Sequence, residues 1–191
     1  MRLIRLMAGA SKWRSLSRGR PMLRSPIFHV KAISNNSMLQ SRGRPKLLAV
    51  SSGGGHWVQM LRIKRAFEDC EVTFVTVHES YRAQVPDHKF YLVNDANRWT
   101  KVGLLKAALR LARIVWNEKP DIVVSTGAAP GYLALRFGRI MGARTIWLDS
   151  IANVEQLSMS GDRISHCADL WLTQWPHLAR PDGPHYEGSV R

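Results

Sequence analysis

The sequence predicts an α/β domain in which helices cover both faces of a parallel sheet. From residue 46 onward, short apolar runs alternate with longer segments of helical periodicity. The runs are apolar throughout rather than at every second residue, as in strands that are buried on both faces. The chain has 191 residues, of which 45% are hydrophobic and 22% charged, and this size and composition fit one globular domain.

The first half of this pattern contains three predicted strands. Residues 47–50 form a wholly apolar run, followed by a glycine-rich loop and a helical pattern that ends at Phe67. Residues 71–77 are rich in β-branched side chains, which favour a strand. Residues 90–93 form a third apolar run.

The second half begins with a long helix. Residues 100–117 carry apolar side chains every three or four positions, and Pro120 ends the pattern. A strand at 121–125, a helix at 131–141 and strands at 144–148 and 170–173 follow. Strands that alternate with helices in this way are typical of a Rossmann-like layered domain.

The positive charge is concentrated at the N-terminus. Residues 1–46 contain eleven Lys and Arg residues and no Asp or Glu, so they carry most of the formal net charge of +14. Because the rest of the chain is nearly neutral, we expect no nucleic-acid partner. Residues 1–45 are predicted to be a basic, disordered extension, and residues 46–191 the folded domain. The extension fits an arm on an anionic membrane, a transit peptide, or a stretch before a true start at Met22 or Met38.

Composition also limits the chemistry of the domain. Two cysteines, Cys70 and Cys167, cannot build a disulfide framework, and no Cys or His spacing indicates a zinc site. We therefore expect a reducing compartment, no metal and no cofactor. No apolar stretch reaches the roughly 20 residues of a membrane-spanning helix.

Three loops follow the carboxyl ends of predicted strands, which is where open parallel sheets bind ligands. The first combines three glycines with a histidine, so a ligand can approach the backbone and an anion can meet the following helix N-terminus. It lacks the spacing of a Walker loop or a dinucleotide-binding motif. The alternative for the first loop is a tight turn without a ligand, and for the second loop, at 125–131, it is simple helix-start chemistry. The candidate substrate-binding residues are Ser52, Gly53, Gly54, Gly55, Thr126, Gly127, Ala128, Gly131 and Glu155.

Four motifs carry a resemblance to known proteins. They are Ser-Ser-Gly-Gly-Gly-His at 51–56, Pro-Asp-Ile-Val-Val-Ser-Thr-Gly-Ala-Ala-Pro-Gly at 120–131, Trp-Leu-Asp-Ser at 147–150 and Leu-Thr-Gln-Trp-Pro at 172–176. Together they resemble the oligosaccharide-biosynthesis family of split glycosyltransferases, over about residues 46–191. That family includes bacterial PssD-like subunits and the anchor subunit of the dolichol-pathway UDP-N-acetylglucosamine transferase, and it is distantly similar to the N-terminal half of MurG.

The resemblance implies the N-terminal half of a GT-B glycosyltransferase. A separate small catalytic subunit would carry the UDP-sugar-binding half, and this chain would be inactive without it. The implied reaction moves N-acetylglucosamine or a related sugar from a UDP-sugar, as co-substrate, to a polyprenyl-diphosphate-linked acceptor. The implied location is peripheral, on the cytoplasmic face of a membrane. Two alternatives are a non-catalytic membrane scaffold for a separately competent enzyme and a stand-alone nucleotide-binding domain.

An inverting sugar transfer needs a base near the acceptor hydroxyl. By resemblance His56 is the first candidate, since the ordinary pKa of histidine near 6.5 suits a general base. Asp149 is the second candidate, either as the base or as the residue that orients His56. The alternative is that His56 only binds the loop or a sugar. The remaining histidines are expected to be surface or structural residues: His29, His78, His88, His166, His177 and His185.

The predicted helix at 100–117 has two apolar strips. One contains Val102, Leu105, Leu109, Ala112 and Trp116, and the other contains Leu104, Ala108, Leu111 and Val115. Lys106, Arg110 and Arg113 border the first strip, so one strip can pack on the sheet while the other meets an anionic membrane surface. The alternative is a helix buried on both sides.

The segment 171–186 is the predicted docking surface for the partner subunit. Its aromatic residues Trp171, Trp175 and Tyr186 lie near an otherwise polar end of the chain. The alternative is that these aromatic residues close the core of this domain.

Overall fold

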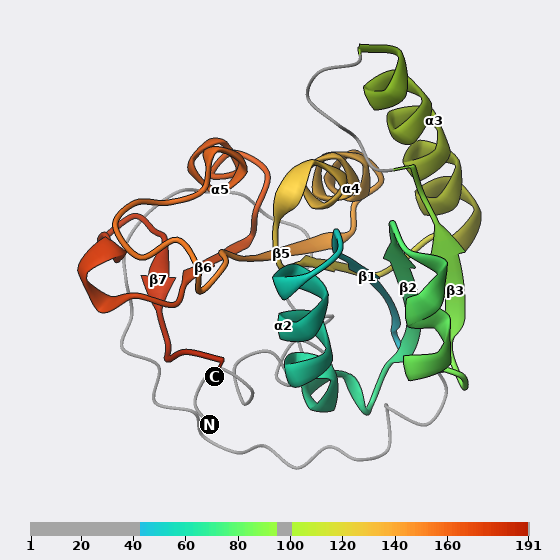
Figure 1. Ribbon diagram of the computed structural model, residues 1–191, viewed down its shortest axis with the longest axis horizontal. Helices are drawn as coiled ribbons and strands as arrows, with labels where there is room; N and C mark the ends of the chain where they lie inside the picture. The colour runs from blue at the N-terminus through green and yellow to red at the C-terminus, as the bar shows by residue number, and fades with distance from the viewer. Residues whose placement is uncertain (1–42, 95–100, 191) are drawn as a thin grey trace.

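The computed structural model describes residues 43–94 and 101–190, and these residues form a seven-stranded sheet with helices on both faces (Figure 1). All neighbouring strands are parallel, in the order β3-β2-β1-β4-β5-β6-β7. The predicted Rossmann-like α/β class is therefore confirmed. The strands are β1 (Lys46–Val50), β2 (Glu71–Thr76), β3 (Lys89–Leu92), β4 (Ile122–Ser125), β5 (Arg144–Leu148), β6 (Leu170–Thr173) and β7 (His185–Tyr186).

All six predicted strands are present within one residue of their expected ends. The strand β7 was not predicted, because two residues are too short to show a pattern; it pairs with β6 through Leu172 and His185. The helices are α2 (Gly55–Ile63), which continues as a 3-10 turn over Lys64–Phe67, then α3 (Lys101–Glu118), α4 (Ala128–Ile140) and the short α5 (Met159–Arg163). Helix α4 begins three residues earlier than predicted, since Pro130 is tolerated in a first helical turn.

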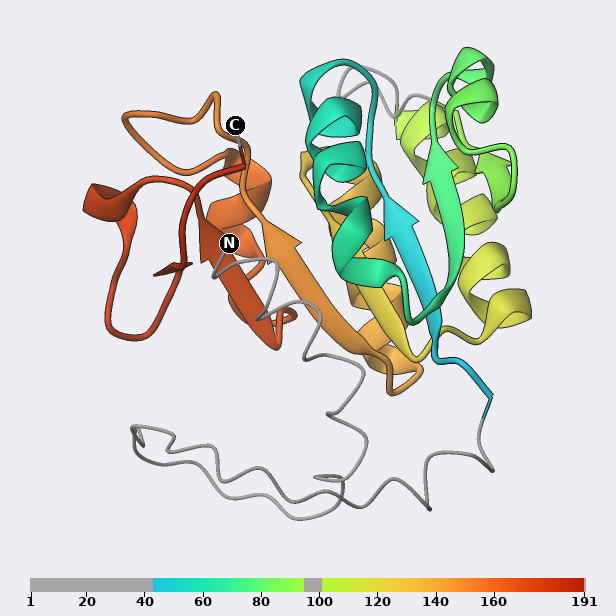
Figure 2. The same ribbon diagram turned by 90° about the horizontal axis from the view of Figure 1, so that it is seen from below.

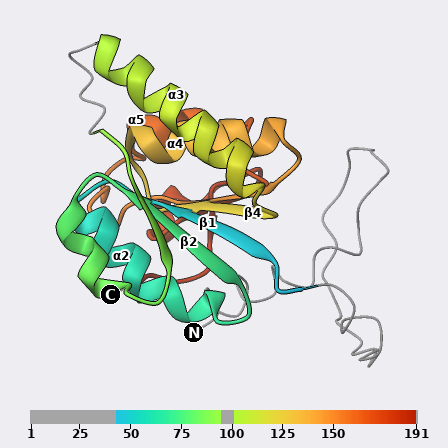
Figure 3. The same ribbon diagram turned by 90° about the vertical axis from the view of Figure 1, so that its right-hand side faces the viewer.

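The sheet separates two apolar layers. Helix α2 covers one face, and α3, α4 and α5 cover the other (Figure 3). Successive residues of β1 enter opposite layers: Ala49 packs in the cluster that contains Trp57 of α2, whereas Val50 packs in the cluster that contains Leu111 of α3 and Leu135 of α4. Both faces of the central strands are buried, which explains why their sequences are apolar throughout.

The side of the sheet on which successive strands are added changes between β1 and β4. From β1 it proceeds to β2 and β3 on one side, and from β4 it proceeds to β5, β6 and β7 on the other. Figure 2 shows the carboxyl ends of β1, β2 and β5 at one edge of the sheet. The loops after β1 and β4 therefore flank the switch point, the place where such sheets form a ligand crevice.

The predicted N-terminal extension, residues 1–45, lies outside the described residues except for 43–45, so it stays a prediction, as does the start of the helix at Thr100. Within the described part of the chain, no helix combines the length and the apolar character needed to cross a membrane.

Candidate functional site at the switch point

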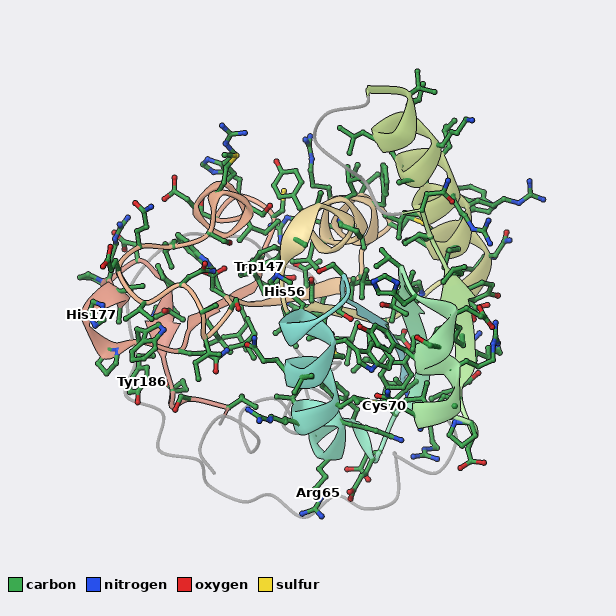
Figure 4. All side chains as sticks on the ribbon, viewed as in Figure 1. His56, Arg65, Cys70, Trp147, His177 and Tyr186 are labelled. Atoms are coloured by element: carbon green, nitrogen blue, oxygen red, sulfur yellow. The ribbon has the colours of Figure 1, made fainter. Side chains whose placement is uncertain are left out.

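Two hydrogen bonds join the loops on either side of the switch point. His56 Nδ1 lies 2.7 Å from the carbonyl oxygen of Thr126, and Thr126 Oγ1 donates to the carbonyl oxygen of His56, also at 2.7 Å. A carbonyl oxygen only accepts, so Nδ1 carries the ring proton in this pair. In the neutral imidazole the lone pair is then on Nε2, which is the form that a general base requires. Figure 4 shows His56 at the N-terminal end of α2.

The backbone after β4 is shaped to hold this imidazole. Gly127 has a φ of 134°, and a Cβ there would lie 2.4 Å from His56 Cε1. Ala128 has a φ of 65°, in the left-handed region that costs a non-glycine residue on the order of 1–3 kcal/mol. Strained residues of this kind cluster where a ligand or a reaction needs a fixed geometry.

Two helices begin at the joined loops, and neither has a side-chain cap. Helix α2 follows Gly54 and helix α4 follows Gly127, and a glycine N-cap has no side chain that could accept from the first helical turn. The N–H groups of these two glycines themselves donate to the Tyr81 and Ser125 hydroxyls. The first N–H groups of a helix lack intrahelical partners and carry the positive end of the helix dipole. Two adjacent N-termini of this kind can bind an anionic group such as a diphosphate.

The three glycines of the first loop have different roles. Gly54 has a φ of 63°, which favours glycine, and a Cβ at Gly53 would lie 2.5 Å from His78 Cδ2. A Cβ at Gly55 would meet no atom within 4 Å. Gly54 and Gly55 therefore face open space in which a ligand can lie. Position 53 must be glycine because any side chain there would collide with the His78 ring.

His78 is a neighbour of the site that sequence reasoning missed. It follows β2, and its ring lies against Gly53 and at 5.4 Å from the ring of Tyr81. The Tyr81 hydroxyl accepts a 2.9 Å hydrogen bond from the Gly54 N–H, and its ring stacks on Trp57 at 4.9 Å. His78 is exposed, as expected of a surface residue, and the parallel pairing of β1 and β2 brings it beside the glycine loop. Its place directly after a predicted strand was the only signal in the sequence.

Asp149 is only 1% exposed, and its carboxylate serves the loop that follows β5. It accepts hydrogen bonds from the Ser158 N–H at 2.9 Å and the Ser158 hydroxyl at 2.6 Å, and from Trp147 Nε1 and Asn153 Nδ2 at 3.3 Å. The orienting partner of His56 is the Thr126 carbonyl, so the prediction that Asp149 orients His56 is corrected. Four donors occupy the buried carboxylate, which favours a structural role over that of a base.

The other predicted binding residues lie at different depths. A Cβ at Gly131 would lie 1.8 Å from Ser125 Oγ, so this buried glycine allows α4 to pack on β4 and does not face a ligand. Ser52 is half-buried, and its carbonyl oxygen accepts a hydrogen bond from Thr76 Oγ1 at 3.4 Å. Glu155 is exposed on the loop that follows β5. Among the described residues, no three His, Cys, Asp or Glu side chains are grouped so that they could hold a metal ion.

A second surface feature lies on α3, the outermost helix (Figure 1). Leu111 and Val115 of the second apolar strip are buried, whereas Leu104 at its start is 39% exposed, so only the later turns of that strip face the core. The first strip is exposed, which excludes the alternative of burial on both sides. Its exposed members are Val102, Leu105, Leu109 and Trp116, each between 60% and 66% exposed. The predicted basic border is exposed beside it: Lys106, Arg110 and Arg113.

The aromatic residues near the C-terminus divide between core and surface. Trp171 and Trp175 are half-buried, and Trp175 Nε1 donates to the carbonyl oxygen of Ile151 at 2.9 Å. Only Tyr186 of the three is exposed, at 40%. It lies with His177 at the β7 end of the molecule, away from His56 (Figure 4).

The fold is that of a Rossmann-like domain of the GT-B type. The solved structure of MurG from Acinetobacter baumannii matches with a TM-score of 0.60 at 15% identity, over 76% of this chain and 46% of MurG. UDP-N-acetylglucosamine 2-epimerase from Rickettsia bellii matches with a TM-score of 0.53 at 12% identity, over 70% of this chain and 40% of the epimerase. The chain thus spans less than half of each of these proteins.

The sequence identifies the family. Residues 92–189 match the family described as "Oligosaccharide biosynthesis protein Alg14 like", and the chain belongs to that family. It is 29% identical to the UDP-N-acetylglucosamine transferase subunit ALG14 of Yarrowia lipolytica, over 71% of this chain and 76% of the relative. It is 28% identical to the subunit of the same name from Rattus norvegicus, over 80% of this chain and 85% of the relative. The suspected family is therefore confirmed.

Proposed function

We propose that this chain is the acceptor-side subunit of a two-subunit glycosyltransferase. The enzyme transfers N-acetylglucosamine or a related sugar from a UDP-sugar to a polyprenyl-diphosphate-linked acceptor. The observation that carries the proposal is an imidazole, oriented through Nδ1, between two helix N-termini without side-chain caps. The names of the relatives, which are UDP-N-acetylglucosamine transferase subunits, support the sugar and the division into subunits.

In the proposed reaction His56 is the general base. Its Nε2 takes the proton of the acceptor hydroxyl as that oxygen attacks the anomeric carbon of the sugar. The bond from the anomeric carbon to the diphosphate breaks on the opposite face, so the configuration inverts and UDP leaves with the bonding electrons. The Thr126 carbonyl favours the required tautomer and stabilises the imidazolium that forms.

The N-termini of α2 and α4 bind a diphosphate in this proposal. Gly54 and Gly55 leave room for its oxygens, and the helix N–H groups and dipoles compensate their charge. Since this chain is the acceptor side, the diphosphate is that of the lipid-linked acceptor. His78 borders the same space at Gly53 and can donate a further hydrogen bond.

A separate small subunit supplies the UDP-sugar-binding half. The described residues contain one Rossmann-like sheet, whereas a GT-B enzyme binds its two substrates between two such units. The end of the sheet at β7, with exposed Tyr186, is the proposed docking surface. UDP-sugar is the co-substrate, and no metal or cofactor takes part.

Helix α3 contacts the membrane that holds the acceptor. Its exposed apolar strip has the basic border that an anionic bilayer surface attracts. The location that follows is peripheral, on the cytoplasmic face of a membrane. This surface is also what a purely recruiting subunit would need, and such a scaffold is the second candidate function.

Substitution of His56 distinguishes the two candidates. In the co-expressed two-subunit enzyme, His56→Ala is expected to leave the complex intact and to lower transfer by about 10²–10⁴-fold, the range for a general base. His166→Ala, at an exposed histidine beyond α5, is the matched control. Transfer at the wild-type rate by an intact His56→Ala complex would establish the scaffold instead.

A further inference from the structure

Two buried glutamines from distant parts of the chain form a pair. Gln59 of α2 is 3% exposed, and Gln174, directly after β6, is 2% exposed. Gln174 Nε2 donates to Gln59 Oε1. Buried amides are costly unless their donors and acceptors find partners, so the other partners of this pair show what it holds together.

Gln59 joins the first turn of α2 to the loop after β5. Its Nε2 donates to the carbonyl oxygen of Gly55 at 3.3 Å and to Ser150 Oγ at 3.1 Å. Its Oε1 also accepts from the Ile151 N–H at 3.2 Å. Gly55 precedes His56, so Gln59 acts directly on the turn that carries the candidate base.

Gln174 joins this assembly to the C-terminal segment. Its Nε2 also donates to the carbonyl oxygen of Asp149 at 2.9 Å, and its Oε1 accepts from the Val190 N–H at 2.8 Å. Arg62 of α2 donates to the Val190 carbonyl oxygen at 3.3 Å, and the Val190 side chain is buried. Figure 2 shows the chain returning from β7 toward the loop after β5.

We propose that Gln174 is a positioning residue for His56. Through it, the position of the first turn of α2 depends on how residues 187–190 pack against the domain. Without the Val190 N–H, the Gln174 amide loses the donor that fixes its orientation. Its hydrogen bond to Gln59 then weakens, and so does the hydrogen bond from Gln59 Nε2 to the Gly55 carbonyl oxygen. The catalytic consequence rests on the proposed function, whereas the structural coupling does not.

Amide hydrogen exchange on the full chain tests the coupling at both ends. Val190→Pro removes the backbone N–H, and Val190→Ala retains it; Gln174→Met removes the amide, and Gln156→Met makes the same change at an exposed position. Val190→Pro and Gln174→Met are each expected to speed exchange in the first turns of α2 by about tenfold, as for the loss of one hydrogen bond. The two control variants and the amides of α4 are expected to match the wild type.

The double variant shows whether the effect passes through Gln174. Since either change breaks the same connection, Val190→Pro with Gln174→Met is expected to speed exchange no more than Gln174→Met alone. The proposal would be overturned if the increase in exchange rate in the double variant equalled the product of the two single-variant increases. It would also be overturned if the α2 amides of folded Val190→Pro exchanged at the wild-type rate. If Val190→Pro fails to fold, wild-type exchange of α2 in Gln174→Met decides against it equally.

A kinetic readout separates positioning from simple destabilisation. In the complete two-subunit enzyme, Gln174→Met is expected to lower kcat by about tenfold, with an unchanged KM for the UDP-sugar. A raised KM with wild-type kcat would contradict a role in positioning His56. If the α2 amides exchange faster in Gln174→Met but the wild-type complex shows no transferase activity, the proposed function is rejected and the structural coupling stands.

Discussion

The absence of a side chain at Gly127 leaves the space in which the His56 ring lies. The imidazole occupies the space that a Cβ at this position would take. The loop after β4 therefore both orients the ring, through the Thr126 carbonyl, and receives it. No other described glycine has a would-be Cβ this close to His56.

Gly127→Ala is expected to displace His56 and to abolish the bond from Nδ1 to Thr126. Transfer by the two-subunit enzyme should fall toward the level of His56→Ala, about 10²–10⁴-fold below the wild type. Gly142→Ala is the matched control, because Gly142 also has a positive φ, of 84°, but open space around its Cα. Equal transfer by the two variants would show that catalysis does not depend on the position of the His56 ring against Gly127.

Asp149→Asn is expected to lower stability. The substitution places an NH₂ group against donors such as the Ser158 N–H, so a buried hydrogen bond is lost at a cost of about 1–3 kcal/mol. Urea unfolding followed by fluorescence measures this change, with exposed Asp182→Asn as the control. Wild-type stability combined with lost transfer would instead make Asp149 a catalytic group.

Helix α3 has one buried and one exposed apolar face. Its inner face packs in the core through Leu111 and Val115, and its outer face leaves Leu105, Leu109 and Trp116 in solvent. Exposed apolar side chains that form a continuous strip indicate an interaction surface.

Charge reversal on α3 is expected to abolish binding to anionic vesicles. In a variant that lacks residues 1–45, Lys106/Arg110/Arg113→Glu should lower vesicle affinity by about 100-fold or more, since each cation contributes about 1 kcal/mol. Arg65/Arg163/Arg180→Glu reverses the same number of exposed charges elsewhere. Equal sedimentation with anionic and neutral vesicles would rule out this contact.

The start of β3 gives the fold a pH dependence. Burial, assisted by the charge of Lys64, lowers the pKa of His88, although Asp87 opposes the shift. The unfolded chain therefore binds a proton near pH 6.5 that the folded chain resists, and stability should fall as the pH drops below about 6.5. Urea midpoints between pH 5 and 8 should show a shallower fall in His88→Asn; an identical fall would exclude His88 as its source.

At the scale of the whole molecule, the described residues form one sheet whose carboxyl edge carries the candidate site. The glycine loop, the loop after β4 and the loop after β5 lie at the carboxyl ends of three adjacent strands. In the proposed function, a donor must also bind opposite this edge. The proposal therefore assigns part of the active site to the partner subunit.

The isolated chain is therefore expected to show no transfer from UDP-N-acetylglucosamine to a polyprenyl-diphosphate-linked acceptor. Addition of the purified partner subunit should restore it, and His56→Ala with the same partner should not. Radiolabelled sugar recovered in the lipid fraction measures each rate. An ordinary enzymatic rate, about 1 s⁻¹ or more, from the chain alone would contradict the split-enzyme proposal.

The sequence by itself determined six of the seven strands, the three long helices and the family. The strands and long helices follow from local periodicity, and His56 and the glycines belong to contiguous motifs. Such patterns are encoded over neighbouring residues, so no tertiary contact is needed to recognise them. The two strips of α3 were likewise visible, and the basic border marked the one that is exposed.

The tertiary structure decided which side chains meet. His56 binds Thr126 across 70 residues, Gln59 pairs with Gln174 across 115, and His78 reaches Gly53 only because β1 and β2 are adjacent. The Asp149 carboxylate forms hydrogen bonds within its own loop and none with His56. These pairings depend on strand order and on the close packing of the two apolar layers, and neither is written in a local pattern. The composition of the site could therefore be predicted in part, but its hydrogen bonds could not.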